Sequence, residues 1–371
     1  MTRATARGGV AGVGRAFTLV ELLVVVALFV VLLAIGVPAF RGMLESSDET
    51  MAENAMRGGV AAARDAAARG GQGQDAAAVF FYDSVSHKIS IVPCVFVGTL
   101  LDQSGLLIPG GSNEVLRDVF VPMSGYEPSQ LPRGWIARGY AGPNSIDNEW
   151  YGTGAYAGSN VRQQGNWLFP ETDFYDWDVA NSGANRQTFM IRFEGGTGAL
   201  KPADGQAVLI VSPAPSDDFR NTGVFADTRF RLDTSANQLR TVRQILDAPF
   251  TGAAALTIQQ RRQLLGDIAS DTVLAKPVRL VSLCNDARGL APYMNVRLDR
   301  ATASIYQNAT TPQFVSGVDL DTMNEYINGA EPNTPPNAPL LETRARIFSV
   351  HRYLGTLLEI TGTIDGQGVG Q

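Results

Sequence analysis

A single carboxylate, Glu21, lies inside a long apolar segment, and its position suggests a chemical purpose. Between Leu19 and Phe40 it is the only ionisable side chain. A carboxylate in hydrocarbon carries a large free-energy cost unless a cation pairs with it. We therefore expect Glu21 to form a buried charge pair; the alternative is that its side chain reaches the membrane surface and stays hydrated.

Two groups of acidic and amide side chains could bind calcium through oxygen ligands. They are Asp173, Asp176 and Asp178, near Glu171, and Asp319 and Asp321, with Asn324 and Glu325. Neither group has the glycine and distal glutamate of an EF-hand loop, so solvated turns or helix caps are the alternative. We expect no metal and no other cofactor, and calcium is kept only as the alternative.

Signals for enzymatic chemistry are sparse in this sequence. The two histidines, His87 and His351, lie far apart in the chain, and no Gly-x-Ser-x-Gly, His-Glu-x-x-His or Cys-x-x-Cys motif occurs. The glycine-rich run at 195–198 lacks the Lys-Ser/Thr pair of a phosphate-binding loop and is expected to be a turn. The sequence therefore predicts a protein that is not an enzyme.

Only two cysteines are present, Cys94 and Cys284. An exported body would permit a disulfide between them, and two separate buried thiols are the alternative. The sequence does not decide between the two.

Charge is distributed unevenly along the chain. Residues 1–16 hold three arginines and no acid, whereas the remainder holds 27 basic and 36 acidic residues, a net charge of −9. An acidic body disfavours nucleic-acid binding, because phosphate contacts need Lys and Arg. The exception would be a local basic patch made of Arg229, Arg231, Arg240 and Arg243.

The apolar segment at 19–40 is long enough to cross a bilayer at about 1.5 Å per residue. The arginines before it should stay in the cytoplasm, so the C-terminal body should be exported. A cleaved signal peptide is the alternative, but it normally has a shorter apolar region and a small-residue cleavage site. We therefore expect a retained membrane helix.

Residues 16–23, with the sequence AFTLVELL, resemble the signature of type IV prepilins and type II secretion pseudopilins. The resemblance implies that a prepilin peptidase cuts between Ala16 and Phe17 and methylates the new amine of Phe17. Glu21 would then be the fifth mature residue and Pro38 the twenty-second, where this family often has a proline that kinks the helix.

The resemblance also implies that the fifth-residue glutamate pairs, in a filament, with the N-terminal ammonium of a neighbouring subunit. Such a pair repays its desolvation only when both charges are present, so it would fix the register between Glu21 and the neighbour. The family usually has glycine before the cut, where this chain has Ala16. Cleavage after Gly14 is the alternative, and it would make Glu21 the seventh residue.

After Pro38 the helix should continue through residues 41–69 and end at Gly70-Gly71. Gly58-Gly59 should be its least stable part. Apolar residues recur there at steps of three and four, which predicts one buried face. They are Ala52, Ala55, Met56, Val60, Ala63 and Ala67. This face should pack on a sheet.

Residues 76–82 and 88–97 read as two strands joined by a hairpin. The segments 61–83 and 87–94 resemble the GspH/FimT pseudopilin type, in which an Ala-Arg-x-x-Ala helix end leads into the first strands. Two later segments, 189–200 and 206–215, look like that family's strand with a glycine turn and the strand that follows.

Residues 100–187 exceed the needs of a small pilin head and hold Trp150, Trp167 and Trp177. These rings are expected to form the small core of an inserted lobe; an exposed recognition loop is the alternative. Farther on, we expect a helix at 256–268, a strand at 278–283 and a proline-rich connector at 331–340. Residues 346–360 should supply the last strand or two.

The fold class predicted from these features is α+β and pilin-like, with a long N-terminal transmembrane helix packed on an antiparallel β-sheet head enlarged by insertions. The expected parts are a leader at 1–16, a transmembrane half at 17–40 and an amphipathic half at 41–70. The head should follow at 71–371, with an inserted lobe at about 100–187.

The expected function is that of a minor pseudopilin of a type II secretion system, anchored in the inner membrane and assembled into a periplasmic pseudopilus. Its expected partners are the prepilin peptidase, other pseudopilin or pilin subunits, the inner-membrane assembly platform and membrane lipid, but not nucleic acid. The alternative function is a minor type IV pilin whose head binds DNA or a surface.

Overall fold

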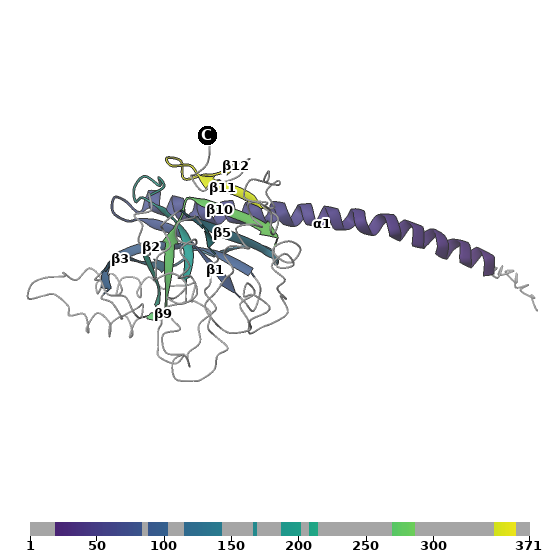
Figure 1. Cartoon of the computed structure of the whole chain (residues 1–371), viewed down its shortest axis with the longest axis horizontal. Helices are drawn as coiled ribbons and strands as arrows, with labels where there is room; N and C mark the ends of the chain where they lie inside the picture. The colour runs from purple at the N-terminus through teal and green to yellow at the C-terminus, as the bar shows by residue number, and fades with distance from the viewer. Residues whose placement is uncertain are drawn as a thin grey trace, which may run out of the picture. The chain divides into compact units, whose positions relative to one another are not determined.

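The computed structural model describes residues 19–83, 88–102, 115–142, 166–168, 187–201, 208–213, 269–285 and 345–360. Contacts divide the chain into two units, 1–50 and 51–371. One long helix and twelve strands make up the described elements (Figure 1), so the chain is α+β.

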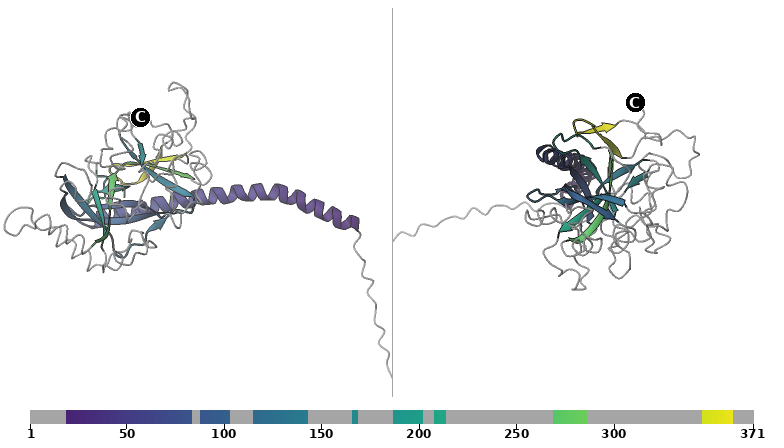
Figure 2. Two further views of the ribbon diagram at one scale, coloured as in Figure 1. Left: turned by 60° about the horizontal axis from the view of Figure 1, so that its bottom comes forward. Right: turned by 90° about the vertical axis from the view of Figure 1, so that its left-hand side faces the viewer.

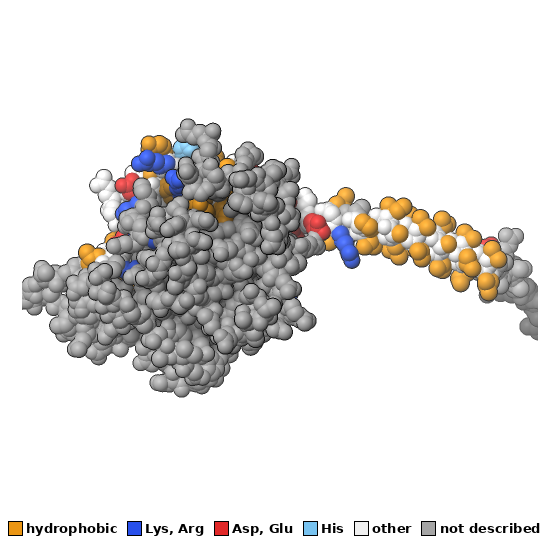
Figure 3. All heavy atoms as spheres, in the orientation of Figure 1, with side chains coloured by type: hydrophobic (Ala, Val, Ile, Leu, Met, Phe, Trp, Pro, Cys, Tyr) orange, Lys and Arg blue, Asp and Glu red, His pale blue; other side chains and the backbone are white. Residues whose placement is uncertain are grey.

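Helix α1 runs from Leu19 to Arg69 and includes Pro38 in its interior. Apolar side chains cover its first part and are exposed there, as the orange atoms in Figure 3 show. The helix is long and apolar enough to cross a membrane, and none of the apolar stretch is buried. The helical assignment continues on both sides of Pro38, and the predicted kink there stays a prediction.

The C-terminal part of α1, from Met51 onward, packs into the head along the predicted face. Five of the six predicted apolar residues are at most 1% exposed, and the sixth, Ala55, is partly buried against the same core. In both views of Figure 2 this part of the helix runs alongside strands of the head. The amphipathic helix and its end before Gly70 are therefore confirmed.

The two adjacent glycines of this helix have opposite surroundings, although the sequence marks both as one weak point. A Cβ added at Gly59 would lie 2.7 Å from Ile91 Cγ2 and 3.1 Å from Ser129 Cβ, whereas one at Gly58 would meet nothing within 4 Å. Gly59 therefore lets the helix approach the strands closely, and Gly58 has no such role.

We predict that Gly58→Ala stabilises the full chain by about 1 kcal/mol, because alanine favours the helix, whereas Gly59→Ala destabilises it by about 1–3 kcal/mol through overpacking against Ile91. Urea denaturation of the detergent-solubilised chain, followed by tryptophan fluorescence, measures both changes. Equal shifts of the same sign would contradict this assignment.

The first sheet closes on itself as a six-stranded barrel. Its strands are β1 (Ala76–Asp83), β7 (Gln187–Phe193), β9 (Ala269–Pro277), β8 (Val208–Pro213), β3 (Val115–Pro122) and β2 (Lys88–Asp102), in that order around the ring. The β1–β2 hairpin pairs Asp83 with Lys88 and completes the closure, while the short strand β4 (Ser129–Gln130) pairs with β2 outside the ring.

The expectation of an antiparallel sheet is corrected by this barrel. Two of its pairings, β7–β9 and β3–β8, are parallel. Closure removes the open edges that a flat sheet would expose, which is the physical reason for a ring. The strands predicted at 76–82 and 88–97 are confirmed within it, and the strands expected within 189–200 and 206–215 are β7 and β8.

The second sheet has five antiparallel strands. Their order is β12 (Leu357–Ile360), β11 (Arg346–Val350), β10 (Leu280–Asn285), β5 (Trp135–Ala141) and β6 (Asn166–Leu168). The last two strands predicted at 346–360 are confirmed, and the strand predicted at 278–283 is β10, shifted by two residues. Residues 100–187, expected as an inserted lobe, contribute strands to both sheets, and Trp167 is fully buried in the main core.

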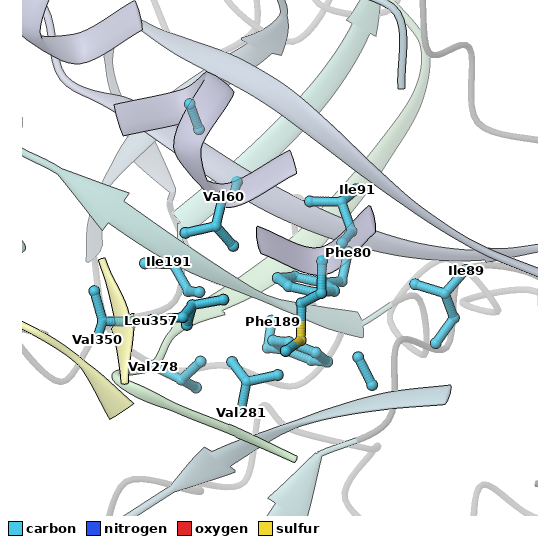
Figure 4. Close-up of a cluster of buried hydrophobic side chains, with 14 of the residues drawn as sticks. Val60, Phe80, Ile89, Ile91, Phe189, Ile191, Val278, Val281, Val350 and Leu357 are labelled. Atoms are coloured by element: carbon cyan, nitrogen blue, oxygen red, sulfur yellow. The ribbon is translucent and has the colours of Figure 1, made fainter. Parts of the chain in front are cut away.

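Two hydrophobic clusters occupy opposite faces of the barrel wall. One cluster contains Ala76, Ala78 and Phe80 of β1 together with the helix and the second sheet, and the other contains Ala77 and Val79 of the same strand. Side chains alternate along a strand, so the second cluster fills the barrel interior. Figure 4 shows part of the first cluster, where the rings of Phe80 and Phe189 stack with centroids 4.5 Å apart.

The two cysteines belong to different clusters. Cys94 lies in the barrel interior and Cys284 lies in the outer cluster, and both are buried thiols rather than halves of a disulfide. Burial raises the pKa of the Cys94 thiol well above its usual range. The disulfide alternative is therefore replaced by two inert core residues.

Candidate functional site

Among the sequence-predicted site residues, the structure describes Glu21 and Pro38 of the apolar stretch. Glu21 lies in the first turn of α1, within the part of the helix able to cross a membrane. Ala16 and Phe17 lie outside the described residues, so the processing site stays a prediction. A carboxylate at this place would have to be neutralised by a partner if the stretch lies in lipid.

The C-terminal end of α1 is held by a glycine turn from another part of the chain. Gly70 N donates to Ala66 O at 3.0 Å, and Gly196 N donates to Ala67 O at 2.9 Å, so carbonyls of the last turn are satisfied. A Cβ at Gly195 would lie 2.6 Å from Gln74 N. The glycine-rich run at 195–198 is thus the predicted turn, and it packs directly on the helix end.

A buried ionic network lies beside this turn, and we name it the Asp75 network. Asp75 Oδ2 accepts from Arg192 Nη2 at 2.7 Å and from Lys201 Nζ at 2.6 Å, and Asp75 Oδ1 accepts from Gly195 N at 3.1 Å. Arg192 Nη2 also lies 2.6 Å from Asp118 Oδ2. Two acids and two bases thus share one site.

Burial and hydrogen bonding act in opposite directions on Asp75. Burial raises its pKa, but hydrogen bonds from Lys201, Arg192 and Gly195 more than offset this, and the pKa lies below its ordinary value. The guanidinium of Arg192 also lies 5.1 Å from the ring centroid of Phe120, in the barrel interior. Asp75 is therefore an ionised carboxylate near neutral pH, and its hydrogen bonds hold β7 and the glycine turn beside the helix end.

A second ionic group connects α1 to the second sheet. Glu53 accepts from Arg57 at 2.7 Å and from Arg346 at 2.6 Å, and Arg346 also donates to Glu359 at 2.6 Å. Burial raises the pKa of Glu53, but the two arginines more than offset this, so the pKa lies below its ordinary value. The hydrogen bond from Arg346 lowers the pKa of Glu359. Since these groups are partly exposed, each pair contributes modestly to stability.

Of the two histidines, only His351 is described, and it has a local role. Its Nδ1 accepts from Leu354 N at 3.1 Å and from Tyr353 N at 3.3 Å, so the ring organises the β11–β12 turn. Within the described part of the chain, no group of three or more His, Cys, Asp or Glu side chains could hold a metal ion.

Several predicted features lie outside the described residues. They are the calcium candidates Asp173, Asp176, Asp178, Asp319 and Asp321, the rings of Trp150 and Trp177, the arginines at 229–243, the helix at 256–268 and the connector at 331–340. Nothing in the structure bears on them, and they stay predictions.

Sequence reasoning missed the Asp75 network. Its signal was a charged residue, Arg192, next to buried apolar residues of β7. They are Phe189, Met190, Ile191 and Phe193. A buried arginine requires an anionic partner, and Asp75, just after the helix end, is one candidate in the sequence. The identity of those partners depends on strand pairings between distant segments.

Comparison with known proteins gave no match for this chain, whether with protein-family models, curated proteins or solved structures.

Proposed function

We propose that this chain is a non-enzymatic minor pseudopilin of a type II secretion system, anchored by α1 in the inner membrane with its head in the periplasm. The observation that carries the proposal is the apolar, exposed N-terminal part of α1 with Glu21 in its first turn. The signature at 16–23 supports it, because it resembles the processing motif of prepilins.

The pilin-like reading of the fold is part of the same proposal. Its support is a long helix whose residues 51–69 bury one face against β-strands of the head. The head differs from a simple antiparallel sheet through its closed barrel and second sheet. We propose that this enlarged head restricts the protein to a minor place in the filament, because a major subunit must pack on all sides.

In this proposal the prepilin peptidase removes residues 1–16 and methylates Phe17. The assembly platform then moves the helix from lipid into the filament core, where apolar side chains of neighbouring helices replace lipid. Glu21 pairs there with the N-terminal ammonium of a neighbour, since two opposite charges in a low dielectric offset their desolvation only together. No step requires bond-breaking chemistry by this chain.

The proposed cleavage site gives a direct prediction. Replacing Ala16 by Trp should leave an unprocessed precursor, because the residue before the cut must be small, whereas Gly14→Trp should be processed normally. Intact mass and N-terminal sequencing of the protein recovered from membranes measure both. A mature chain that begins with methylated Phe17 supports the proposal. A mature chain that begins at Arg15 would place the cleavage site after Gly14. The same conclusion would follow if Gly14→Trp blocked cleavage and Ala16→Trp did not.

A further inference from the structure

The turn between β11 and β12 carries an exposed apolar surface. Tyr353, Leu354 and Leu358 are 72%, 61% and 50% exposed. Exposed Arg352 lies beside them, with its guanidinium 5.7 Å from the ring centroid of Tyr353. We name these four residues the hairpin patch. Figure 3 shows orange, blue and pale blue side chains together at this end of the head.

Few other large apolar side chains are exposed in the described part of residues 51–371. They are Met51, at the start of this unit, and Leu116 on β3. Isolated apolar residues of this kind are common on protein surfaces, whereas several gathered on one turn and the strand after it mark an interaction site. The hairpin patch is therefore the strongest candidate for a docking surface among the described residues of the head.

The backbone of the turn is held in place by bonds to the rest of the head. Arg64 Nη1 of the helix donates to Leu354 O at 3.1 Å, and Leu200 N donates to Arg352 O at 2.8 Å. His351 Nδ1 accepts from Leu354 N at 3.1 Å within the turn. A surface that is already ordered loses little conformational entropy when a partner binds, so the turn is suited to docking.

The charges at the patch indicate the chemistry of its partner. Arg352 and a second exposed arginine, Arg279, take part in none of the ion pairs among the described residues. Arg279 is close to the turn, because its carbonyl oxygen accepts from Val350 N at 2.9 Å. The acids Glu359 and Asp65 are already paired with other arginines. A partner that covers the patch would remove water from Arg352 and must therefore supply a carboxylate.

We propose that the hairpin patch binds a different protein whose surface carries a carboxylate beside apolar side chains, with that carboxylate opposite Arg352. Tyrosine and arginine side chains are enriched among the residues that dominate protein–protein binding. Nucleic acids and anionic membranes are instead bound by clusters of several cations, and the patch itself contains only one arginine. This inference rests on the proposed function, in which a minor subunit is surrounded by different subunits and one of them is the partner.

Photo-cross-linking of the full-length chain in its native host tests this proposal. The photoreactive residue p-benzoylphenylalanine replaces Tyr353 in one strain and Leu116 in another. Leu116 is the matched control, because it is also apolar and is 54% exposed on the same head. We expect an adduct at position 353 and not at position 116. Mass spectrometry of the linked peptide should find a segment of another protein with Asp or Glu beside apolar residues.

Charge reversal then tests the role of the arginine. Adding Arg352→Glu should lower the adduct yield about fivefold, and replacing the mapped acid of the partner by Arg should restore it. Arg133→Glu changes an exposed arginine elsewhere on the head and should leave the yield unchanged. Equal adduct yields at positions 353 and 116, a linked peptide without an acid, a linked lipid, a linked second copy of this chain, or no rescue would overturn the proposal.

The same strains separate this inference from the proposed function, because N-terminal sequencing and filament sedimentation report on the latter. Processed chain in filaments without an adduct specific to position 353 would overturn the inference and leave the proposed function standing. An adduct specific to position 353 with an acidic segment, from a chain that is unprocessed and absent from filaments, would support the patch and overturn the proposed function.

Discussion

Replacing Glu21 by alanine will leave the chain in the membrane but remove it from filaments. In the proposed filament core, Glu21 neutralises the N-terminal ammonium of a neighbour. Without the carboxylate that ammonium would be buried and uncompensated, at a cost of about 3–5 kcal/mol. Such a loss corresponds to about a hundredfold or greater decrease in incorporation. Membrane insertion should persist, because removing a charge makes the apolar stretch more lipophilic.

Membrane and sedimented filament fractions, compared by immunoblotting, measure this result. Glu21→Gln should behave like Glu21→Ala, since it keeps the shape and loses the charge. Glu45→Ala removes an acid from the same helix beyond the apolar stretch and should assemble normally. If Glu21→Ala enters filaments at the wild-type level, the charge-pair account fails, and hydration of Glu21 at the membrane surface becomes the better explanation.

The second large effect is expected at Asp75. Asp75→Asn should lower the free energy of unfolding by about 3 kcal/mol, because Arg192 and Lys201 lose their shared carboxylate. The loss stays at the low end of the range for buried pairs, since Arg192 keeps Asp118. Urea denaturation of the detergent-solubilised chain measures it, and Asp65→Asn is the control. Asp65 pairs with Arg64 in a partly exposed site and should cost less than about 1 kcal/mol.

The effect of Asp75→Asn should depend on pH with a definite sign. The folded-state pKa of Asp75 lies below its ordinary value of 3.8, so its contribution to stability is present above that value and is lost as pH falls through the folded-state pKa. The difference between wild type and Asp75→Asn should therefore be constant near neutral pH and shrink only below about pH 3.8. A difference that shrinks between pH 5 and 8 would assign the effect to another group.

Much of the fold could be predicted because its signals are local. The helix face at 52–67 follows a period of three to four residues, and β1 and β2 follow each other through a short hairpin. Both depend on neighbours in sequence, which patterns report directly. The exposed apolar helix and the position of Glu21 are local signals of the same kind.

The closure of the barrel could not be predicted for the opposite reason. Its parallel pairing of β7 with β9 sets Gln187 beside Leu274, and no sequence pattern specifies a partner at that distance. The Asp75 network depends on the same arrangement, because Arg192 lies on β7 and Asp118 on β3. The separation of the cysteines also depends on these distant pairings, because closure of the ring puts Cys94 inside the barrel, whereas Cys284 lies on β10 of the second sheet.

The bonds between α1 and the last hairpin have a consequence for how the chain folds. Arg346 donates a hydrogen bond to Glu53, which lies 293 residues earlier in the helix. Arg57 of the helix donates one to the carbonyl oxygen of Leu357, which lies 300 residues later. Arg346, which covers part of this helix, is synthesised 293 residues after Glu53. Contacts of such long range form slowly and leave apolar surface exposed in the meantime. In a nascent chain of this protein, that helix face should therefore stay uncovered until β11 and β12 have been made, and a chain truncated before residue 346 would leave the face incomplete.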